Sequence, residues 1–336
     1  MGPPPQFAAP IALQRWLHDG VCSWLEAPLI DNRAELPPRV LYVVGRGVSC
    51  RFCAGAGRTA LELFGLTPAE IAELQDAVAY GTGAQTPHAL SMRLVAAVAR
   101  GGAGPTDPKP AELAAAGVSA MQVAELYFLA ARAVLTTRIT LTTRIAPHPI
   151  EHSAARWLTP LRPLLRLSMR LLGPKRGQPR ALLPTELDGP LPACVAVMDG
   201  VPAAPLVRQL IDAALAAGAL TAGEKALIFA VVAMTLGNDA AQAEMTERAL
   251  ACGVAKPDRV LQTLGADETA EFREMLGLAR ALVRPEPADV HRRAEAVLAA
   301  CRPERFVDAL GTAAVANAVL RLPSLRAFLP NHCGVA

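Results

Sequence analysis

The sequence predicts an all-α protein made of two similar helical halves. Of its 336 residues, 52% are hydrophobic, with Ala and Leu dominant, whereas only 4% are aromatic. This balance is typical of helices that pack through small side chains. Segments with the alternating pattern of a strand are nearly absent, and the length suits one large domain or two ordinary ones.

Composition also restricts the compartment and the kind of partner. The net charge of +3 is too close to neutral to indicate a nucleic acid partner. The first residues, MGPPPQF, lack the basic and apolar regions of a secretory signal, and the longest apolar run, Ala226 to Leu236, is too short to span a bilayer. The seven cysteines do not form the pattern of a secreted disulfide scaffold. We therefore expect a cytoplasmic protein with no membrane span and no nucleic acid partner.

Apolar periodicity predicts the helices of the first half in order. After residues 1–8, which look disordered, an apolar stripe predicts a helix over 10–26. Two prolines suit the first turn of a helix over 37–48, although Gly45 and Gly47 weaken it.

The next helices have clearer start signals. One follows a C-x-x-C and ends at Gly65, and the next begins with Thr67 as cap, Pro68 in the first position and Glu70 completing a capping box. Further helices are expected over 87–100, 109–116 and 119–143.

A proline-interrupted basic stretch separates the two halves. Residues 151–172 read as a helix broken near two prolines, and Gly173 to Arg180 have linker composition. The helices expected after it cover 202–217, 222–236, 239–251, 256–263, 268–283, 287–300 and 303–321. These signals divide the chain into an N-terminal helix and tail (1–33), a unit with the C-x-x-C (34–150), a basic helical linker (151–184) and a second unit (185–330).

Short sequence patterns of the first unit recur in the second unit at a nearly constant offset. Cys53 stands twelve residues before Gly65, and Ala241 stands twelve before Gly253, an offset of 188. Two further matches follow in the same order, 94–100 with 278–284 and 131–135 with 316–320, at offsets of 184 and 185. We therefore expect a duplicated helical unit of about 150 residues.

The C-x-x-C is the strongest chemical signal in the chain. Cys50 and Cys53 lie one turn apart if Cys50 begins a helix, so they can close a disulfide or supply two ligands to a soft metal. A helix N-terminus lowers a cysteine pKa, and Arg51 and Arg58 add positive charge nearby. In a reducing compartment such a pair is more often catalytic or metal-binding than a static cross-link.

The second half resembles the AhpD-like family, which groups alkylhydroperoxidases with carboxymuconolactone decarboxylases. The resemblance lies in LTAGEKALIFAVVAMTLGNDAAQAEMTERALACGV, where Glu224 falls on the family's glutamate. The family's C-x-x-C-x-x-x-H is replaced here by Asn238, Ala241 and Met245. The second unit thus keeps the helical frame and lacks the thiol chemistry.

The first half departs from the family in the opposite way. Cys50 and Cys53 fall on the paired cysteines, but Gly57 occupies the histidine position and Glu35 is one residue from the glutamate position. The resemblance implies two tandem AhpD-like units that form an all-α pseudo-dimer. Because proteins of this family usually oligomerise, it also implies a homo-oligomer. The implied activity is thiol-dependent reduction of a hydroperoxide. It implies no cofactor, a small-molecule substrate and a thiol reductant of unknown identity.

Site roles follow from this resemblance. One sulfur would attack the peroxide as thiolate, and the other would condense with the sulfenic acid to give a disulfide. Because Gly57 cannot relay a proton, Glu35 or Glu62 is the candidate base. The arginines at 39, 51 and 58 could stabilise a thiolate but cannot carry protons at neutral pH. Glu224 is a supporting candidate in the second unit.

Other functions remain open at this stage. The same scaffold could bind a small molecule or a protein without redox chemistry, or catalyse a decarboxylase-like reaction. A metal site is a minor alternative and would combine the two cysteines with one of three histidines at 88, 148 and 152. Arg138 and Arg144 could contact a ligand, although solvent exposure is the simpler expectation. The basic, leucine-rich stretch around Arg162, Arg166 and Arg170 could likewise be a solvated face or a contact with an acidic partner.

Overall fold

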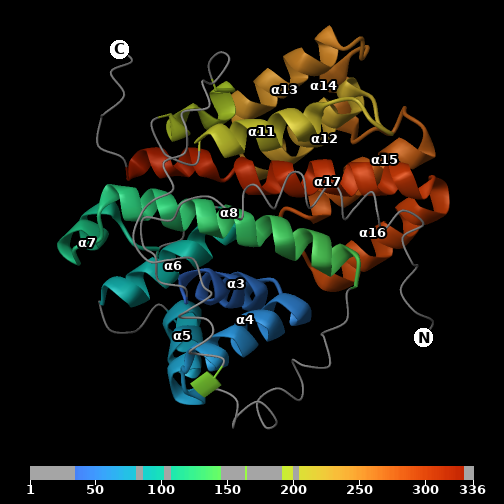
Figure 1. Cartoon of the computed structure of the whole chain (residues 1–336). Coiled ribbons are helices and arrows are strands. Elements are labelled where there is room, and N and C mark those ends of the chain that lie inside the picture. Colours follow the sequence, from blue (N-terminus) through green and yellow to red (C-terminus); the bar gives the residue numbers. More distant parts are fainter. Residues whose placement is uncertain are drawn as a thin grey trace, which may run out of the picture. The chain divides into compact units, whose positions relative to one another are not determined.

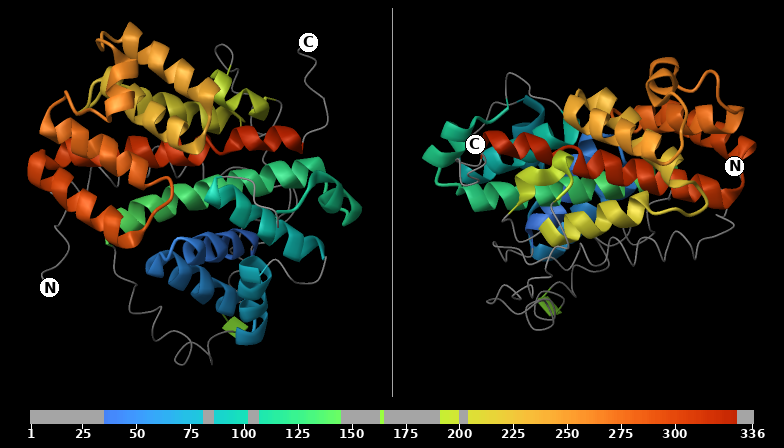
Figure 2. Two further views of the ribbon diagram at one scale, coloured as in Figure 1. Left: turned by 180° about the vertical axis from the view of Figure 1, so that it is seen from behind. Right: turned by 90° about the horizontal axis from the view of Figure 1, so that it is seen from above.

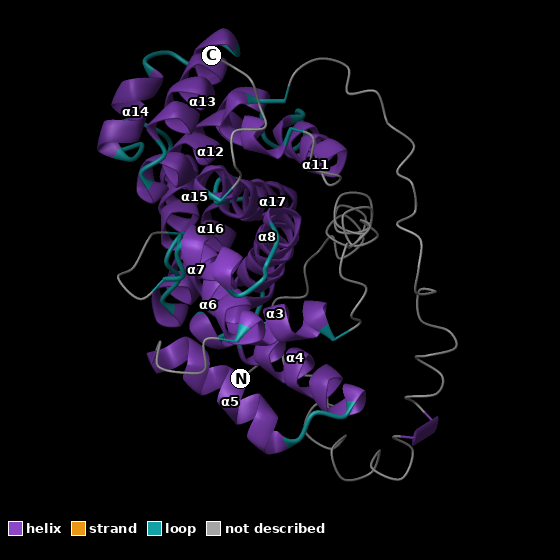
Figure 3. Cartoon of the chain, turned by 90° about the vertical axis from the view of Figure 1, so that its left-hand side faces the viewer, coloured by secondary structure: helices purple, strands orange, loops and turns teal. Residues whose placement is uncertain are grey.

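A computed structural model describes residues 35–80, 86–101, 107–144, 163–164, 191–199 and 204–328. Every regular element in these ranges is a helix and none is a strand, which confirms the all-α prediction for the described part of the chain (Figures 1 and 3). The helix expected over 10–26 and most of the one expected over 151–172 lie outside these residues.

The helices of the first half begin and end close to the predicted positions. Their bounds are Leu36–Gly47 (α3), Arg51–Phe64 (α4), Pro68–Tyr80 (α5), Pro87–Arg100 (α6), Pro110–Ala115 (α7) and Ala120–Thr142 (α8). The capping box of α5 forms as expected, because Glu70 accepts the N–H of Thr67 and the Thr67 hydroxyl accepts the N–H of Glu70.

The helices of the second half also begin and end close to their predicted positions. Its helices are Ala204–Leu215 (α11), Ala222–Leu236 (α12), Asp239–Ala251 (α13), Pro257–Thr263 (α14), Ala270–Ala281 (α15), Pro287–Ala300 (α16) and Pro303–Val319 (α17). Two short 3-10 helices, Ala193–Met198 (η2) and Leu322–Ala327 (η3), were not expected from the sequence.

The chain divides into two compact units. The described part of the N-terminal unit comprises α3 to α7, α8 as far as Ala133, residues 163–164 and the residues from Ser324 onward. The C-terminal unit comprises the end of α8 from Val134 to Arg144, η2 and α11 to α17. The last turns of α8 thus belong with helices that follow them by more than fifty residues.

In the N-terminal unit, α3 and α4 form the closest helix pair. They lie side by side (Figure 2) and run antiparallel, with Gly45 of α3 against Cys53 and Gly57 of α4 against Tyr42. Glycine at both crossing points lets the two backbones approach more closely than a side chain would allow.

In the C-terminal unit, α12 forms the centre of the core. Its residues from Ala226 to Ala233 are all buried, so it is apolar around its whole circumference, and α13, α15 and α17 pack against it. Within the described residues, the stretch Pro303–Ala327 is long and apolar enough to cross a membrane by length and composition, and 89% of its most apolar window is buried in the structure. Buried core helices meet the same criterion, so this finding alone does not identify a membrane span.

The turn that starts α4 recurs at the start of α13. Cys50 is the N-cap of α4, and its sulfur accepts the N–H of Cys53; Asn238 is the N-cap of α13, and its side chain accepts the N–H of Ala241. The N–H of each cap bonds five residues back, at 2.8 Å for Cys50 and 2.9 Å for Asn238.

The ends of these helices also match. Gly65 after α4 and Gly253 after α13 are both left-handed, with φ of 99° and 88°. The next residue in each case, Leu66 or Val254, donates its N–H to a carbonyl five residues back at 3.1 Å. Both ends of the two helices therefore have the same local hydrogen bonds at an offset of 188 residues.

Candidate functional site

The C-x-x-C lies at the N-terminus of α4 with its two sulfurs in contact. The Sγ atoms of Cys50 and Cys53 are 2.8 Å apart, and the N–H of Cys53 points at the Cys50 sulfur at 3.4 Å. No disulfide joins them. At the first turn of a helix, an N–H directed at a sulfur offsets part of the cost that burial places on a negative charge there.

Both sulfurs are buried. The exposed fraction of Cys50 is 2% and that of Cys53 is 0%, so neither sulfur is open to bulk solvent in this conformation. A reaction here requires either a small oxidant or local opening of the first turn of α4. That turn follows a strained residue, Ser49, whose φ of 54° is unfavourable for any residue with a side chain.

Gly45 explains how the pair is held against α3. A Cβ atom at position 45 would lie 2.7 Å from the backbone nitrogen of Ala54 and 2.9 Å from the Cβ of Cys53. The sequence indicates only that this glycine weakens its helix. In the structure, the cysteine-bearing turn packs directly against the backbone of Gly45.

Gly57 has an equally specific environment. A Cβ atom at position 57 would lie 2.8 to 2.9 Å from the backbone and Cβ of Tyr42. The space that a side chain would need at position 57, where the AhpD-like motif has histidine, is thus occupied by the backbone of α3. Tyr42 itself is buried, and its hydroxyl donates to Gln75 at 3.4 Å, so the phenol is bound to α5.

Glu35 lies at the far end of α3 from the thiols. It precedes Gly45 by ten residues, a rise of about 15 Å, and forms an ion pair with Arg39 at 3.3 Å. Arg39 also contacts His88 Nε2 at 2.6 Å. Since a guanidinium only donates, this nitrogen of His88 acts as acceptor. Neither Glu35 nor Arg39 reaches the sulfurs in this conformation.

The remaining candidates on α4 differ in their distance from the thiols. Arg51 is exposed in the first turn, directly beside Cys50. Glu62 follows Cys53 by nine residues, about 13 Å along the helix, and forms an ion pair with Arg58 at 2.9 Å. Of the predicted supporting residues, only Arg51 adjoins the pair.

Two cysteines outside the pair lie where the thiol form is favoured. Burial raises the pKa of Cys194, and the neighbouring Glu244 carboxylate raises it further. Burial and the charge of Glu271 likewise raise the pKa of Cys301, against a smaller opposing effect of Arg305. In the described part of the chain, no three His, Cys, Asp or Glu side chains come together as a metal site would require.

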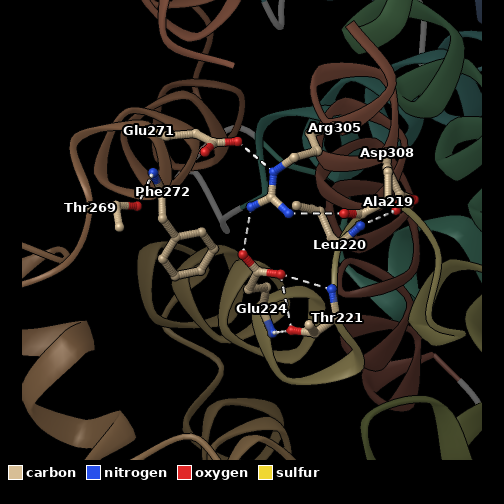
Figure 4. Close-up of polar contacts among 9 residues, drawn as sticks. All are labelled: Ala219, Leu220, Thr221, Glu224, Thr269, Glu271, Phe272, Arg305 and Asp308. Atoms are coloured by element: carbon tan, nitrogen blue, oxygen red, sulfur yellow. Dashed lines mark hydrogen bonds and ion pairs between the residues drawn. The ribbon is translucent and has the colours of Figure 1, made fainter. Parts of the chain in front are cut away.

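Glu224 belongs to a separate polar network in the C-terminal unit (Figure 4). Its carboxylate accepts the N–H and hydroxyl of Thr221 at 2.8 and 3.0 Å, which forms the capping box of α12. Arg305 of α17 donates to Glu224 at 2.7 Å, to the carbonyl of Ala219 at 2.9 Å, and to Glu271. One guanidinium therefore joins α12, α15 and the loop before α12.

The electrostatics of Glu224 follow from these contacts. Burial by itself would raise its pKa, but the hydrogen bonds from Thr221 and Arg305 and the charge of Arg305 outweigh burial and lower it. Next to it, Asp308 accepts the N–H of Leu220 at 2.9 Å and pairs with the buried Lys225 at 2.7 Å. The polar groups of this network are paired with one another, which is the arrangement of a structural tie.

Arg138 is fully buried, so the expectation of a solvated side chain at this position is wrong. Its guanidinium donates to the carbonyls of Leu282 and Val283, at 2.7 and 3.3 Å, at the C-terminal end of α15. Such carbonyls lack helical partners and carry partial negative charge, so a buried cation is stabilised there. Arg144 is half exposed and pairs with Glu295 at 2.7 Å.

The residues that hold these sites together cannot be recognised from local sequence. No pattern marks Gly45 and Tyr42 as contacts of the thiol helix, and Arg305 belongs to no motif. Pairs of helix residues across a crossing have no sequence signature, although glycines spaced along one helical face are a hint. No family model, curated protein or solved structure matches this chain.

Proposed function

We propose that this protein is a cytoplasmic thiol-disulfide oxidoreductase that reduces a small hydroperoxide through Cys50 and Cys53. The observation that carries the proposal is the contact between the two sulfurs at 2.8 Å at a helix N-terminus. Two thiols in contact need little movement to form a disulfide, and the N–H of Cys53 favours a thiolate on Cys50.

The chemistry balances with one external reductant. The Cys50 thiolate attacks the terminal oxygen of the peroxide, the O–O bond breaks, and an alcohol leaves after taking up a proton. The resulting sulfenic acid is attacked by Cys53, which releases water and forms the disulfide. A dithiol reductant then returns both cysteines to thiols and is itself oxidised. The exposed Arg51 beside the pair adds positive charge that favours the thiolate.

We further propose that the chain contains two AhpD-like units in tandem. The matching hydrogen bonds at both ends of α4 and α13, at one constant offset, support a common origin for these helices. In the second copy Asn238 retains the capping role of Cys50 without its chemistry. Family resemblance also favours a homo-oligomer.

The test is peroxide treatment of the folded protein followed by peptide mass spectrometry. We expect a Cys50–Cys53 disulfide in the wild-type protein and a stable sulfenic acid at Cys50 in Cys53→Ser. We expect the wild-type protein to consume peroxide in the presence of a dithiol reductant. Cys50→Ser should abolish this consumption.

Cys252 supplies the matched control because it is an exposed thiol outside the pair. Cys252→Ser should leave peroxide consumption unchanged. Oxidation confined to Cys252, with Cys50 and Cys53 unmodified in the folded protein, would reject the proposal.

Burial of both sulfurs favours a second candidate, a non-redox protein that uses the same helical scaffold for binding. In that case the pair would be structural, and the helix cap made by Cys50 would be its main role. The two candidates differ in one result: the structural pair reacts with peroxide only after the protein is unfolded in denaturant.

A further inference from the structure

Arginine is the only charged residue type in a long stretch around the thiols. Residues 36–61 contain four arginines and no Asp, Glu, Lys or His. Two of the four pair with the acids that bound the stretch, Arg39 with Glu35 at 3.3 Å and Arg58 with Glu62 at 2.9 Å. The charges of these two arginines are therefore balanced one helical turn away.

The other two arginines flank the thiol-bearing turn. Arg46 lies in the last turn of α3 and Arg51 is the first residue of α4, so the four residues between them end in Cys50. Both arginines are exposed, and neither forms an ion pair within the part of the chain that the structure describes. The turn that leads to the sulfurs therefore has two positive charges without a carboxylate beside them.

The same turn leaves space for an approaching molecule. Gly47 and Ser49 are exposed, and a Cβ atom at position 47 would have no neighbour within 4 Å. Val48 and Phe52 are half-buried and supply apolar surface beside the two arginines. Apolar contact bordered by polar and charged groups is the usual composition of a protein–protein interface.

We propose that the turn from Arg46 to Arg51 is the docking surface for the protein that reduces the Cys50–Cys53 disulfide, and that this reductant has its dithiol within an acidic surface. The inference rests on the function proposed above, which requires a dithiol reductant. Complementary charges raise the rate of encounter between two proteins and fix their relative orientation. An encounter held at the two arginines places the reductant against the turn that contains Cys50.

The position of the arginines favours a protein over an anionic hydroperoxide as their partner. Both sulfurs are buried, whereas Arg46 and Arg51 are exposed on the outside of the turn. A peroxide reacts only after it has passed inside the turn. A protein reductant remains outside and contacts the charged surface first.

The exchange balances in two steps. A thiolate of the reductant attacks Cys50, the more exposed of the two sulfurs at 2% against 0%, and the Cys50–Cys53 bond breaks as Cys53 takes up a proton. The second thiol of the reductant loses its proton and attacks the mixed disulfide, which releases Cys50. The reductant supplies both electrons, and its two thiols become a disulfide.

The test compares two synthetic dithiol peptides as reductants of the full-length protein. Both contain the same C-x-x-C, which is flanked by glutamates in one peptide and by lysines in the other. The disulfide is first formed with diamide, so the test does not depend on the reaction with peroxide. The quantity measured is the rate of reduction by the glutamate peptide divided by the rate of reduction by the lysine peptide.

At low ionic strength we expect this rate ratio to fall about tenfold in the double variant Arg46→Glu with Arg51→Glu, because opposite charges become like charges. Salt at about 0.5 M should remove most of the change. Each ratio compares two peptides on one protein, so a change in the reactivity of the disulfide itself cancels. The comparison of wild type with variant cancels the difference in reactivity between the peptides.

Lys109→Glu is the matched control, since it reverses an exposed cation of the same unit at the N-cap of α7, which packs against α6. It should leave the rate ratio unchanged. An equal ratio in wild type and double variant overturns the docking proposal and leaves the thiol-disulfide function standing. Slower oxidation of the double variant by linoleic acid hydroperoxide but not by cumene hydroperoxide, with an equal ratio, assigns the arginines to an anionic substrate instead. If diamide forms no Cys50–Cys53 disulfide, both proposals fail.

Discussion

Glycines on α3 and α4 determine how the thiol pair is positioned. Gly45 and Gly57 each face backbone of the opposite helix at a distance that leaves no space for a Cβ atom. Helix propensity alone disfavours glycine at such positions. Their presence is explained by the close approach of the two helices, and that approach brings Cys53 against α3.

This packing predicts opposite effects for two glycine substitutions on the same helix pair. Gly57→Ala should lower the free energy of unfolding by about 1 to 3 kcal/mol, because its Cβ would overlap Tyr42. A Cβ atom at position 47 would have no neighbour within 4 Å. Gly47→Ala should therefore be neutral or raise the free energy of unfolding by up to about 1 kcal/mol through helix propensity. Urea unfolding followed by circular dichroism measures both. Equal effects of the two changes would contradict the close packing at Gly57.

Glu224 gives a prediction about pH. Its pKa in the folded protein is below its ordinary value of 4.5, so its ion pair and capping bonds stabilise the fold above that pH. Glu224→Gln should cost about 1 to 2 kcal/mol at neutral pH. The difference between wild type and variant should shrink as pH falls below 4.5 and through the lowered pKa, because protonation removes the charge in the wild type as well. A difference that is constant down to pH 3 would show that the carboxylate charge contributes nothing.

At the scale of helices, capping links the two halves of the chain. Asn238 makes the bond at α13 that Cys50 makes at α4. Asn238→Ala should cost about 1 kcal/mol of stability, because the N–H of Ala241 loses its acceptor. Asn238→Ser retains an acceptor and should cost less. An equal loss in both variants, measured by thermal unfolding, would indicate that packing rather than the cap is responsible.

Most helices could be predicted from the sequence because their limits depend on local chemistry. The starts of α5 and α12 follow from Thr-x-x-Glu capping boxes, and the ends of α4 and α6 follow from glycines that adopt positive φ. Periodicity and caps involve residues within one or two turns, so a sequence contains them in full.

The arrangement of the candidate site was less predictable because it depends on contacts between distant residues. The thiols were located correctly at a helix start, but nothing local to Glu35 shows that it faces Arg39 and lies about 15 Å from them along α3. Arg138 illustrates the same limit. Its β-branched neighbours at the end of α8 suggest nothing about Leu282 and Val283, which its guanidinium binds.

At the scale of the whole molecule, the end of α8 is part of the C-terminal unit although it is continuous with a helix of the other unit. Residues 134–144 make three contacts within this unit. Arg138 donates hydrogen bonds to carbonyls at the end of α15, and the carbonyl of Leu141 contacts His291 Nε2 at 3.0 Å. Arg144 forms an ion pair with Glu295. A C-terminal fragment cut at the basic linker would therefore lose a buried cation and the side-chain donor to the carbonyl of Leu282, whereas the carbonyl of Val283 would keep its hydrogen bond from Arg321.

Two fragments test this consequence. The fragment 134–323 should unfold cooperatively, whereas 185–323 should be less stable by about 3 kcal/mol or more, because the carbonyl of Leu282 loses its side-chain donor and apolar surface is uncovered. Arg138→Met in the longer fragment isolates the contribution of the guanidinium and should account for part of that difference. Equal denaturation midpoints for the two fragments would mean that α8 adds no stability to this unit, and that residues 185–323 alone contain everything it needs to fold.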